Sequence, residues 1–363
     1  MQGCLRKGKV ATLFLLISFA AVLRAQELRQ LPTPTEGDYF FLDFHFMSGE
    51  ALPKLRMHYA TFGTPVRDAK GQVTNAVLLL HGTSGTGAQF LAPQFAGVLF
   101  GPGQLLDVTR YYIILPDDLG HGKSSKPSDG MHAHFPQYTY DDMVVAEYLL
   151  LKDLGVNHLR LILGTSMGCM HAWLWGEGFP DFMDALMPLA CQPVQIAGRN
   201  RAWRKMVIDA IRDDPDWKNG EYTSQPLSAL EVAADMFYIA GGAALPMQQN
   251  LPTREATDAA AQVFAKRFIA DHDANDLLYA VNASRNYDPS PQLEKITAPV
   301  MFVNSADDFI NPPELGIAER EIKRVKNGRF VLLPISEQGH GHGTHTWAAA
   351  WQQYLKELLK ASQ

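Results

Sequence analysis

The sequence predicts an α/β fold in which a mostly parallel central sheet is flanked by helices. Short apolar runs, each bounded by Gly, Pro or Asp, recur along the chain at 76–80, 111–115, 159–163, 185–189, 300–303 and 330–333. Continuous apolar runs of this length are typical of strands that are buried on both faces. Helical stretches such as 140–154 and 170–176 lie between most of them, and this alternation indicates a parallel sheet covered on both sides.

Two segments that precede these runs predict a β-hairpin. Residues 39–46 are rich in aromatic side chains, residues 55–61 alternate in polarity, and Ser48-Gly49 lies between them. A Gly-containing turn between two such segments favours an antiparallel pair of strands.

The stretch from 193 to 287 contains no convincing strand and predicts a helical lid inserted before the strand at 300–303. Helical segments follow one another at 201–212, 229–240, 253–272 and 276–284. Ligands bind open α/β sheets at the C-terminal ends of the strands, so an insertion of this size most simply covers that edge. The alternative is a helical domain packed elsewhere. We therefore assign 26–192 to the first part of the core, 193–287 to the lid and 288–363 to the second part of the core.

The composition limits the class of protein. The 363 residues include 47% apolar and 19% charged side chains, a balance that excludes a disordered chain and a disulfide scaffold. The net charge of −6 gives no electrostatic basis for nucleic-acid binding. A chain of this length forms one large domain or two smaller ones.

The N-terminal segment 1–25 predicts a secretory signal peptide. Basic residues at 6–9 precede 14 apolar-rich residues at 10–23, and the small residue Ala25 follows. The alternative is an uncleaved anchor, but a membrane span needs about 20 apolar residues. We therefore expect an exported protein, periplasmic or extracellular, with no stable membrane insertion after cleavage.

Export permits disulfide bonds, and cleavage leaves two cysteines, Cys169 and Cys191. Each lies near the end of a predicted strand, and we interpret both as small buried apolar residues rather than as a bridged pair. The sequence contains no Cys and His spacing typical of a structural zinc site, so no metal is expected.

The strongest local signal for chemistry is Gly164-Thr165-Ser166-Met167-Gly168, which lies between a predicted strand and a predicted helix. Glycine on both sides permits a sharp turn that lifts the serine oxygen above the sheet. The turn also places the serine at a helix N-terminus, where negative charge is stabilised. We therefore predict that Ser166 is a nucleophile.

A serine nucleophile needs a base, and the base needs an acid that orients it. In this type of fold the chain order is serine, acid, histidine. The acid follows the next-to-last strand, where Asp307 and Asp308 are adjacent. The histidine follows the last strand, where His340, His342 and His345 are candidates. We favour His342, because it is flanked by glycines directly before the next predicted helix, over a metal site built from the three histidines.

Two glycine-rich loops follow earlier strands. The loop at 81–85 follows the strand at 76–80, and it predicts that the backbone N–H of Thr83 faces the Ser166 oxygen. With the N–H of Met167 it would form an oxyanion hole. The loop at 119–125 lacks the full phosphate-binding pattern, and we interpret it as a border of the pocket.

With these motifs the chain resembles the α/β-hydrolase superfamily and, within it, the homoserine O-acetyltransferases, from about residue 59 to residue 351. The segments that carry the resemblance are 59–63 with 75–78, the 164–168 turn, Asp214-Pro215-Asp216-Trp217 with Gly220 and Tyr222, 273–275 with 287–288, and 305–312. The resemblance places the family's catalytic Asp on Asp307, and it leaves open a homodimer formed through the lid.

The chain departs from that family beside its histidine. The family's catalytic His is normally followed by an Asp that helps to hold the amino group of homoserine, whereas Gly343 follows His342 here. Homoserine and acetyl-CoA are also cytosolic metabolites, and this chain is predicted to be exported. The fold and the triad are therefore expected to carry over, and the acetyl-transfer activity is not.

The sequence thus predicts a serine hydrolase that acts on a small-molecule ester or related acyl substrate. Ser166 attacks the acyl carbonyl, His342 transfers the proton, Asp307 orients the imidazole, and the N–H groups of Thr83 and Met167 hold the oxyanion. Water releases the acyl group, and no cofactor is required. One alternative is an acyltransferase that uses the same acyl-serine. A second is a binding protein that kept the fold without turnover.

Overall fold

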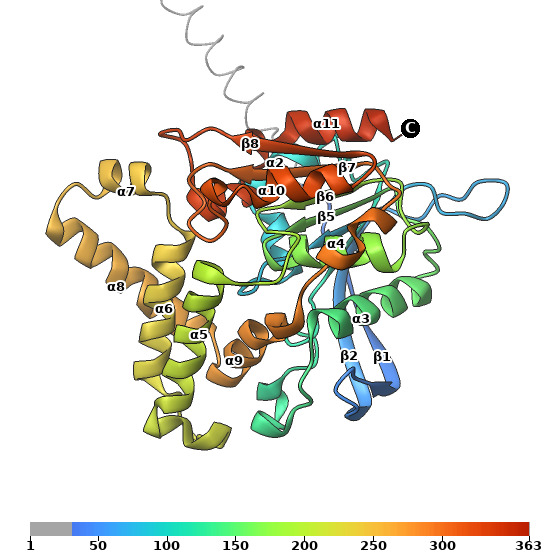
Figure 1. Ribbon diagram of the computed structural model, residues 1–363. Helices are drawn as coiled ribbons and strands as arrows, with labels where there is room; N and C mark the ends of the chain where they lie inside the picture. The colour runs from blue at the N-terminus through green and yellow to red at the C-terminus, as the bar shows by residue number, and fades with distance from the viewer. Residues whose placement is uncertain (1–30, 363) are drawn as a thin grey trace, which may run out of the picture. The chain divides into compact units, whose positions relative to one another are not determined.

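The computed structural model describes residues 31–362, of which the part from Pro34 onward forms one compact unit (Figure 1). The predicted signal peptide at 1–25 lies outside the described residues. One sheet contains eight strands: β1 (Thr35–His45), β2 (Ala51–Phe62), β3 (Ala76–Leu80), β4 (Tyr112–Pro116), β5 (Leu161–Thr165), β6 (Leu186–Leu189), β7 (Val300–Ser305) and β8 (Gly328–Leu333).

The strand order confirms the predicted fold class. The strands are arranged as β1-β2-β4-β3-β5-β6-β7-β8. The predicted hairpin pairs β1 with β2 in antiparallel register, β2 pairs antiparallel with β4, and all other neighbours are parallel. Strands β3 to β7 are buried along their whole length, as expected of continuous apolar runs between two helical layers.

Helices cover both faces of the sheet (Figure 1). The core helices are α2 (Pro93–Leu99), α3 (Tyr140–Asp153), α4 (Met167–Gly178), α10 (Ile317–Glu321) and α11 (Gln352–Ala361). A capping box at the start of α3 fixes its first turn, because the Thr139 and Asp142 side chains each bond the other residue's backbone N–H. Helix α4, which carries Trp173 and Trp175 fully buried, packs directly against β5 and β6 and so anchors the turn that precedes it.

The described elements between β6 and β7 are all helical. They are α5 (Gly198–Asp213), α6 (Leu227–Gly241), α7 (Ala244–Asn250), α8 (Arg254–Asp271) and α9 (Ala274–Asn282), with one 3₁₀ segment between α5 and α6 and two after α9. Figure 1 shows α5, α6 and α8 packed together to one side of the sheet. They share an apolar cluster of their own, centred on side chains such as Val207, Leu230 and Phe268. We refer to residues 193–287 as the lid.

Within residues 31–362, no single helix is both long and apolar enough to cross a membrane. Helices α6 and α7 pass that test of length and composition only when they are joined, and they are bent by 106° at their junction.

Candidate active site

Ser166 occupies a strained turn between β5 and α4. Its backbone has φ 54° and ψ −106°, a conformation with positive φ that L-residues rarely adopt. A side chain at Gly164 would collide with the backbone of Gly168, and one at Gly168 would collide with the backbone of Leu80. The two glycines are therefore required by close packing of the turn, as the motif predicts, and the strain is held by buried structure on both sides.

His342 connects Ser166 to a carboxylate. The His342 Nε2 atom lies 2.8 Å from Ser166 Oγ. The His342 Nδ1 atom lies 3.1 Å and 3.0 Å from the two carboxylate oxygens of Asp308. Both partners are nearly excluded from solvent. When Nδ1 carries the ring proton and donates a hydrogen bond to the carboxylate, Nε2 is unprotonated and can accept the Ser166 proton.

The other two histidines of this loop do not contact Ser166. His340 stacks on Trp347, with ring centroids 3.8 Å apart and planes 12° apart. His345 is half-buried and lies beside His342, at 5.1 Å between ring centroids, and desolvation lowers its pKa to about 3. The structure therefore brings only His342 to the nucleophile.

The structure corrects the expectation that Asp307 orients the histidine. The turn after β7 directs the Asp308 side chain inward to His342. The Asp307 carboxylate instead accepts hydrogen bonds from Ser305 Oγ at 2.7 Å and from the backbone N–H of Gly341 at 3.3 Å. Asp307 thus ties the histidine loop to β7, and Asp308 is the acid that contacts the imidazole.

Asp308 is held as a carboxylate although it is buried. Burial alone would raise its pKa, but the facing His342 ring and hydrogen bonds from Asn311 outweigh that effect, so the pKa lies below its ordinary value. The backbone N–H groups of Ile310 and Asn311 donate to Asp308 Oδ1 at 2.8 Å and 3.1 Å. The Asn311 amide donates to Asp308 Oδ2 at 3.0 Å.

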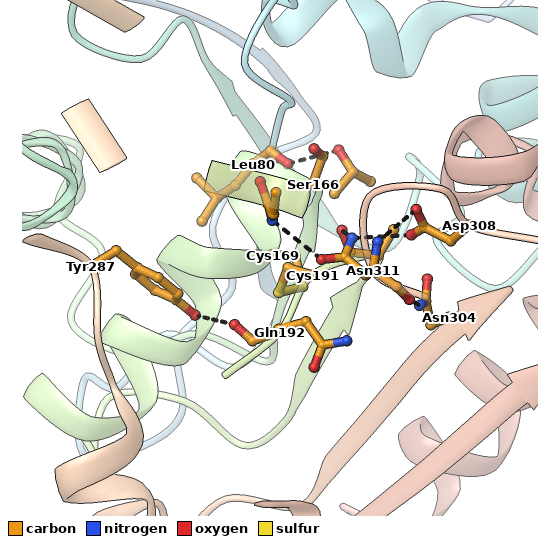
Figure 2. The surroundings of a disulfide bond; sticks show 12 residues. Leu80, Ser166, Cys169, Cys191, Gln192, Tyr287, Asn304, Asp308 and Asn311 are labelled. Carbon is orange, nitrogen blue, oxygen red and sulfur yellow. Dashed lines mark hydrogen bonds between the residues drawn. A yellow bond between two sulfur atoms is a disulfide. The ribbon is translucent and has the colours of Figure 1, made fainter. Parts of the chain in front are cut away.

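Asn311 is a site residue that sequence reasoning missed. Its Nδ2 group donates to the carbonyl of Ala190 at 3.1 Å as well as to Asp308, and its own carbonyl accepts from Asn304 at 2.8 Å (Figure 2). The sequence signal that could have found it is its position, three residues after Asp308 and directly before Pro312. Asn side chains in tight turns commonly form hydrogen bonds with nearby backbone and side chains. Asn311 thereby links the acid loop to the end of β6.

Cys169 and Cys191 form a disulfide, which corrects the expectation that they remain unpaired. Their Cα atoms lie 5.8 Å apart, a separation typical of bridged cysteines, because the first turn of α4 runs beside the residues that follow β6. Figure 2 shows the bridge beneath Ser166 and beside the Asn311 network. Since Ala190 precedes Cys191, the segment after β6 is bonded covalently to the nucleophile helix and by hydrogen bonds to the acid loop.

The predicted oxyanion residues lie on the two expected sides of the serine. Gly82, which precedes Thr83, approaches Ser166 so closely that a side chain on it would contact the serine Cβ at 3.5 Å. The carbonyl of Thr83 lies 2.8 Å from His121 Nε2, a contact that fixes the loop. Met167 follows Ser166 as the first residue of α4. The oxyanion role of the two N–H groups stays a prediction.

A cavity of about 410 Å³ opens at Ser166 between the core and the lid. The core contributes the loop at 82–85 and His342. The lid contributes an aromatic wall formed by Trp203, Phe237, Phe264 and Phe268. Lid side chains thus line the same cavity as Ser166.

A second ionisable cluster lies fully buried between α3, α4 and the residues after β4. His171 Nδ1 lies 2.8 Å from Glu147 Oε1 and 3.7 Å from Asp118 Oδ2, and Trp175 Nε1 donates to Glu147 Oε2 at 2.5 Å. Burial raises the pKa of Asp118 and raises that of Glu147 to about 7, and it lowers that of His171. The three donor groups lie within 4.8 Å of one another, but N–H groups already occupy both oxygens of Glu147, which favours a hydrogen-bonded cluster over a metal centre.

Known proteins share this fold and part of this sequence. The family model described as alpha/beta hydrolase fold matches residues 75–345. A homoserine O-acetyltransferase of Citrifermentans bemidjiense is 30% identical over 344 residues, which cover 84% of this chain and 90% of that protein.

Solved structures agree on the fold. A homoserine O-acetyltransferase from Bacillus anthracis superimposes with a TM-score of 0.79 at 21% identity and covers 91% of this chain and 98% of its own. An acetylester hydrolase from Corynebacterium glutamicum gives 0.78 at 20% identity, with 90% and 96% covered. The chain belongs to the α/β-hydrolase family and, as its sequence predicts, resembles the homoserine O-acetyltransferases within it.

Proposed function

We propose that this protein is a serine hydrolase that cleaves carboxylic esters through an acyl-serine intermediate. The observation that carries the proposal is the hydrogen-bonded series from Ser166 Oγ through the His342 ring to the Asp308 carboxylate. It has the order and contacts of a nucleophile, a base and an orienting acid.

The proposed reaction has two halves. Ser166 Oγ forms a bond to the acyl carbon while its proton passes to His342 Nε2, and the carbonyl oxygen becomes an oxyanion held by the N–H groups of Thr83 and Met167. The bond to the alcohol oxygen then breaks, and His342 gives that oxygen its proton. In the second half, water attacks the acyl carbon as His342 accepts a water proton, and the returned proton restores Ser166 as the acid leaves. Asp308 stabilises the charged imidazolium in both halves.

Acyl transfer to an alcohol is the second candidate function. The similarity to homoserine O-acetyltransferases favours it, since an alcohol would replace water in the second half. Two features of this chain favour water instead. The first is that Gly343 follows His342, where the family has the Asp that helps to hold the amino group of homoserine. The second is that Arg267 and Asp271, the described charged pair at the cavity, lie 3.7 Å from each other. Neither carboxylate nor ammonium recognition of an amino-acid acceptor is therefore evident in the lining.

The test uses the chain from Gln26 onward. We expect a fluorophosphonate probe to add to one site, found by peptide mass spectrometry on the segment that contains Ser166. We expect p-nitrophenyl butyrate to be hydrolysed to butyrate at a rate that 10 mM homoserine leaves unchanged, a concentration on the order of ten times a high KM.

A different outcome separates the candidates. Acceleration by homoserine, together with an O-acylated product, would establish the transferase reaction and reject the hydrolase. Absence of both the adduct and turnover in folded protein, checked by circular dichroism, would reject enzymatic activity and support a binding role.

We also propose that the protein is exported and processed after Ala25. The buried Cys169–Cys191 bridge supports this, because disulfides persist in oxidising compartments and are rare in the cytosol. When the full chain is expressed in a bacterium that secretes proteins, we expect an intact mass that begins at Gln26 and two cysteines that react with iodoacetamide only after reduction. Retention of residues 1–25, or alkylation without reductant, would contradict the proposal.

A further inference from the structure

The cavity at Ser166 is larger than an acetyl group requires. Its volume of about 410 Å³ lies in the range of sites that enclose whole ligands of drug size. A two-carbon acyl group on Ser166 would leave most of that space without substrate atoms. The size of the cavity therefore points to a longer acyl group.

The wall opposite the serine is continuous, aromatic and contributed by three lid helices. Trp203 of α5 contacts Phe237 of α6 with ring centroids 5.3 Å apart, and Phe237 contacts Phe268 of α8 at 5.1 Å. Phe264 extends the wall along α8, 5.9 Å from Phe268. Trp203 and Phe268 are buried, so the wall is supported by packing from behind. Such a surface gains free energy by covering a hydrocarbon chain.

The charges around this cavity do not suit an ionic ligand. Among the described lining residues, Arg267 and Asp271 pair with each other. His272 stacks on Phe268 with ring centroids 4.0 Å apart, and burial lowers its pKa, which keeps the ring neutral. The Arg267 and Asp271 side chains are 86% and 60% exposed and therefore stay in solvent, so the aromatic part of the lining gives no charged partner to a carboxylate or ammonium group on the substrate.

A second, polar cavity lies beside the first. It has a volume of about 510 Å³ and shares the loop at 83–85 and residues 271–272 with the first cavity. Its lining includes Lys126, Gln225 and Asp276, with Lys126 paired to Asp276 at 3.3 Å. Ser166 and His342 line the apolar cavity and not the polar one, so the acyl group bonded to Ser166 lies in the apolar cavity, and the polar cavity across the loop suits water or the far end of a polar alcohol.

We infer that the substrates are esters whose acyl chain is unbranched, carries no charged group and contains roughly six to ten carbon atoms. The acyl chain lies against the aromatic wall of the lid. The inference rests on the proposed function, since it assigns the acyl side of the same reaction. Each buried methylene contributes about fourfold to binding. The relative rates of successive esters therefore report directly on the contact between the acyl chain and the wall.

The experiment measures kcat/KM for p-nitrophenyl esters from acetate to dodecanoate, together with hexyl and octyl acetate. We expect kcat/KM for the octanoate ester to exceed kcat/KM for the acetate ester by at least about tenfold, which is a fraction of the increase that six buried methylenes allow. Among the alkyl acetates, kcat/KM should rise little as the alcohol becomes longer.

A variant that narrows the cavity tests the location. Gly241, the last residue of α6, lines the cavity, and an added Cβ there meets no atom within 4 Å. We expect Gly241→Leu to lower the octanoate-to-acetate ratio by at least about tenfold. Gly178→Leu is the matched control, because Gly178 also ends a helix, has the same open surroundings and does not line the cavity. That variant should keep the wild-type ratio.

Each outcome decides a different question. A Ser166-dependent profile that peaks at acetate would overturn the inference while the proposed function stands. An unchanged ratio in Gly241→Leu, or a larger gain with alkyl acetates than with acylates, would also overturn it. Absence of Ser166-dependent hydrolysis at every chain length would instead reject the proposed function.

Discussion

The Ser166→Ala and His342→Ala variants are each expected to lower kcat for ester hydrolysis by about 10⁴- to 10⁶-fold, and the double variant by no more than either one. The two groups act as one unit, because His342 Nε2 lies 2.8 Å from Ser166 Oγ and has no base function without that oxygen. Steady-state kinetics with p-nitrophenyl butyrate on the three purified variants measures this non-additivity. Residual turnover of about 10³-fold over water is expected from the oxyanion hole and binding alone.

The control for this pair is His340→Ala. His340 belongs to the same loop but stacks on Trp347 and does not reach Ser166. We expect less than about a tenfold loss of kcat, since the contact that is removed is a packing contact. Losses that simply add in the Ser166 and His342 double variant, or a His340 effect as large as that of His342, would show that the histidine assignment is wrong.

The second large loss of kcat is expected at Asp308, and the adjacent Asp307 provides its control. Asp308→Asn is expected to lower kcat by about 10⁴-fold, because an amide that faces His342 Nδ1 no longer fixes the tautomer or stabilises the imidazolium. Asp307→Asn is the matched change one residue earlier. In the wild type, Ser305 Oγ and the Gly341 N–H donate to different oxygens of Asp307. In Asn the amide oxygen can keep the Gly341 contact and the NH2 group can donate to Ser305 Oγ, so we expect less than about a tenfold loss.

The readout that distinguishes the two roles is kcat measured together with the folded structure. In Asp308→Asn the rate should fall without a loss of folded structure by circular dichroism, whereas Asp307→Asn should keep both. Equal losses in both variants would contradict the assignment of Asp308 as the orienting acid.

The sheet and the turn at Ser166 could be predicted from sequence because local patterns determine them. Buried parallel strands are marked by short apolar runs, and the turn at Ser166 is marked by two glycines that its close packing requires. The acid could not be separated from its neighbour in this way. Asp307 and Asp308 have the same chemistry in the same turn, and only the path of the backbone after β7 decides which carboxylate faces His342.

The remaining differences arise from distances between segments that are remote in sequence. The bridge between Cys169 and Cys191 depends on how α4 lies beside the end of β6. The number of residues between the two cysteines does not determine that distance. Asn311 has a role only because Ala190 is within reach of its amide. Helix α7 is short and contains Pro246, so its residues carry little helical signal.

The buried cluster around His171 has a consequence for how the chain exchanges protons when it folds. Asp118 and Glu147 have raised pKa values in the folded state, so folding retains protons on acids that the unfolded chain releases as the pH rises above about 4. His81, His121 and His171 have lowered pKa values, so folding expels protons that the unfolded chain keeps below about pH 6.5. The acids therefore make folding less favourable as the pH rises between these values, and the histidines make it more favourable. At about pH 5.5, between these two values, the effects oppose each other, and folding amounts to a transfer of protons from these imidazoles to these two carboxylates that leaves these five groups uncharged.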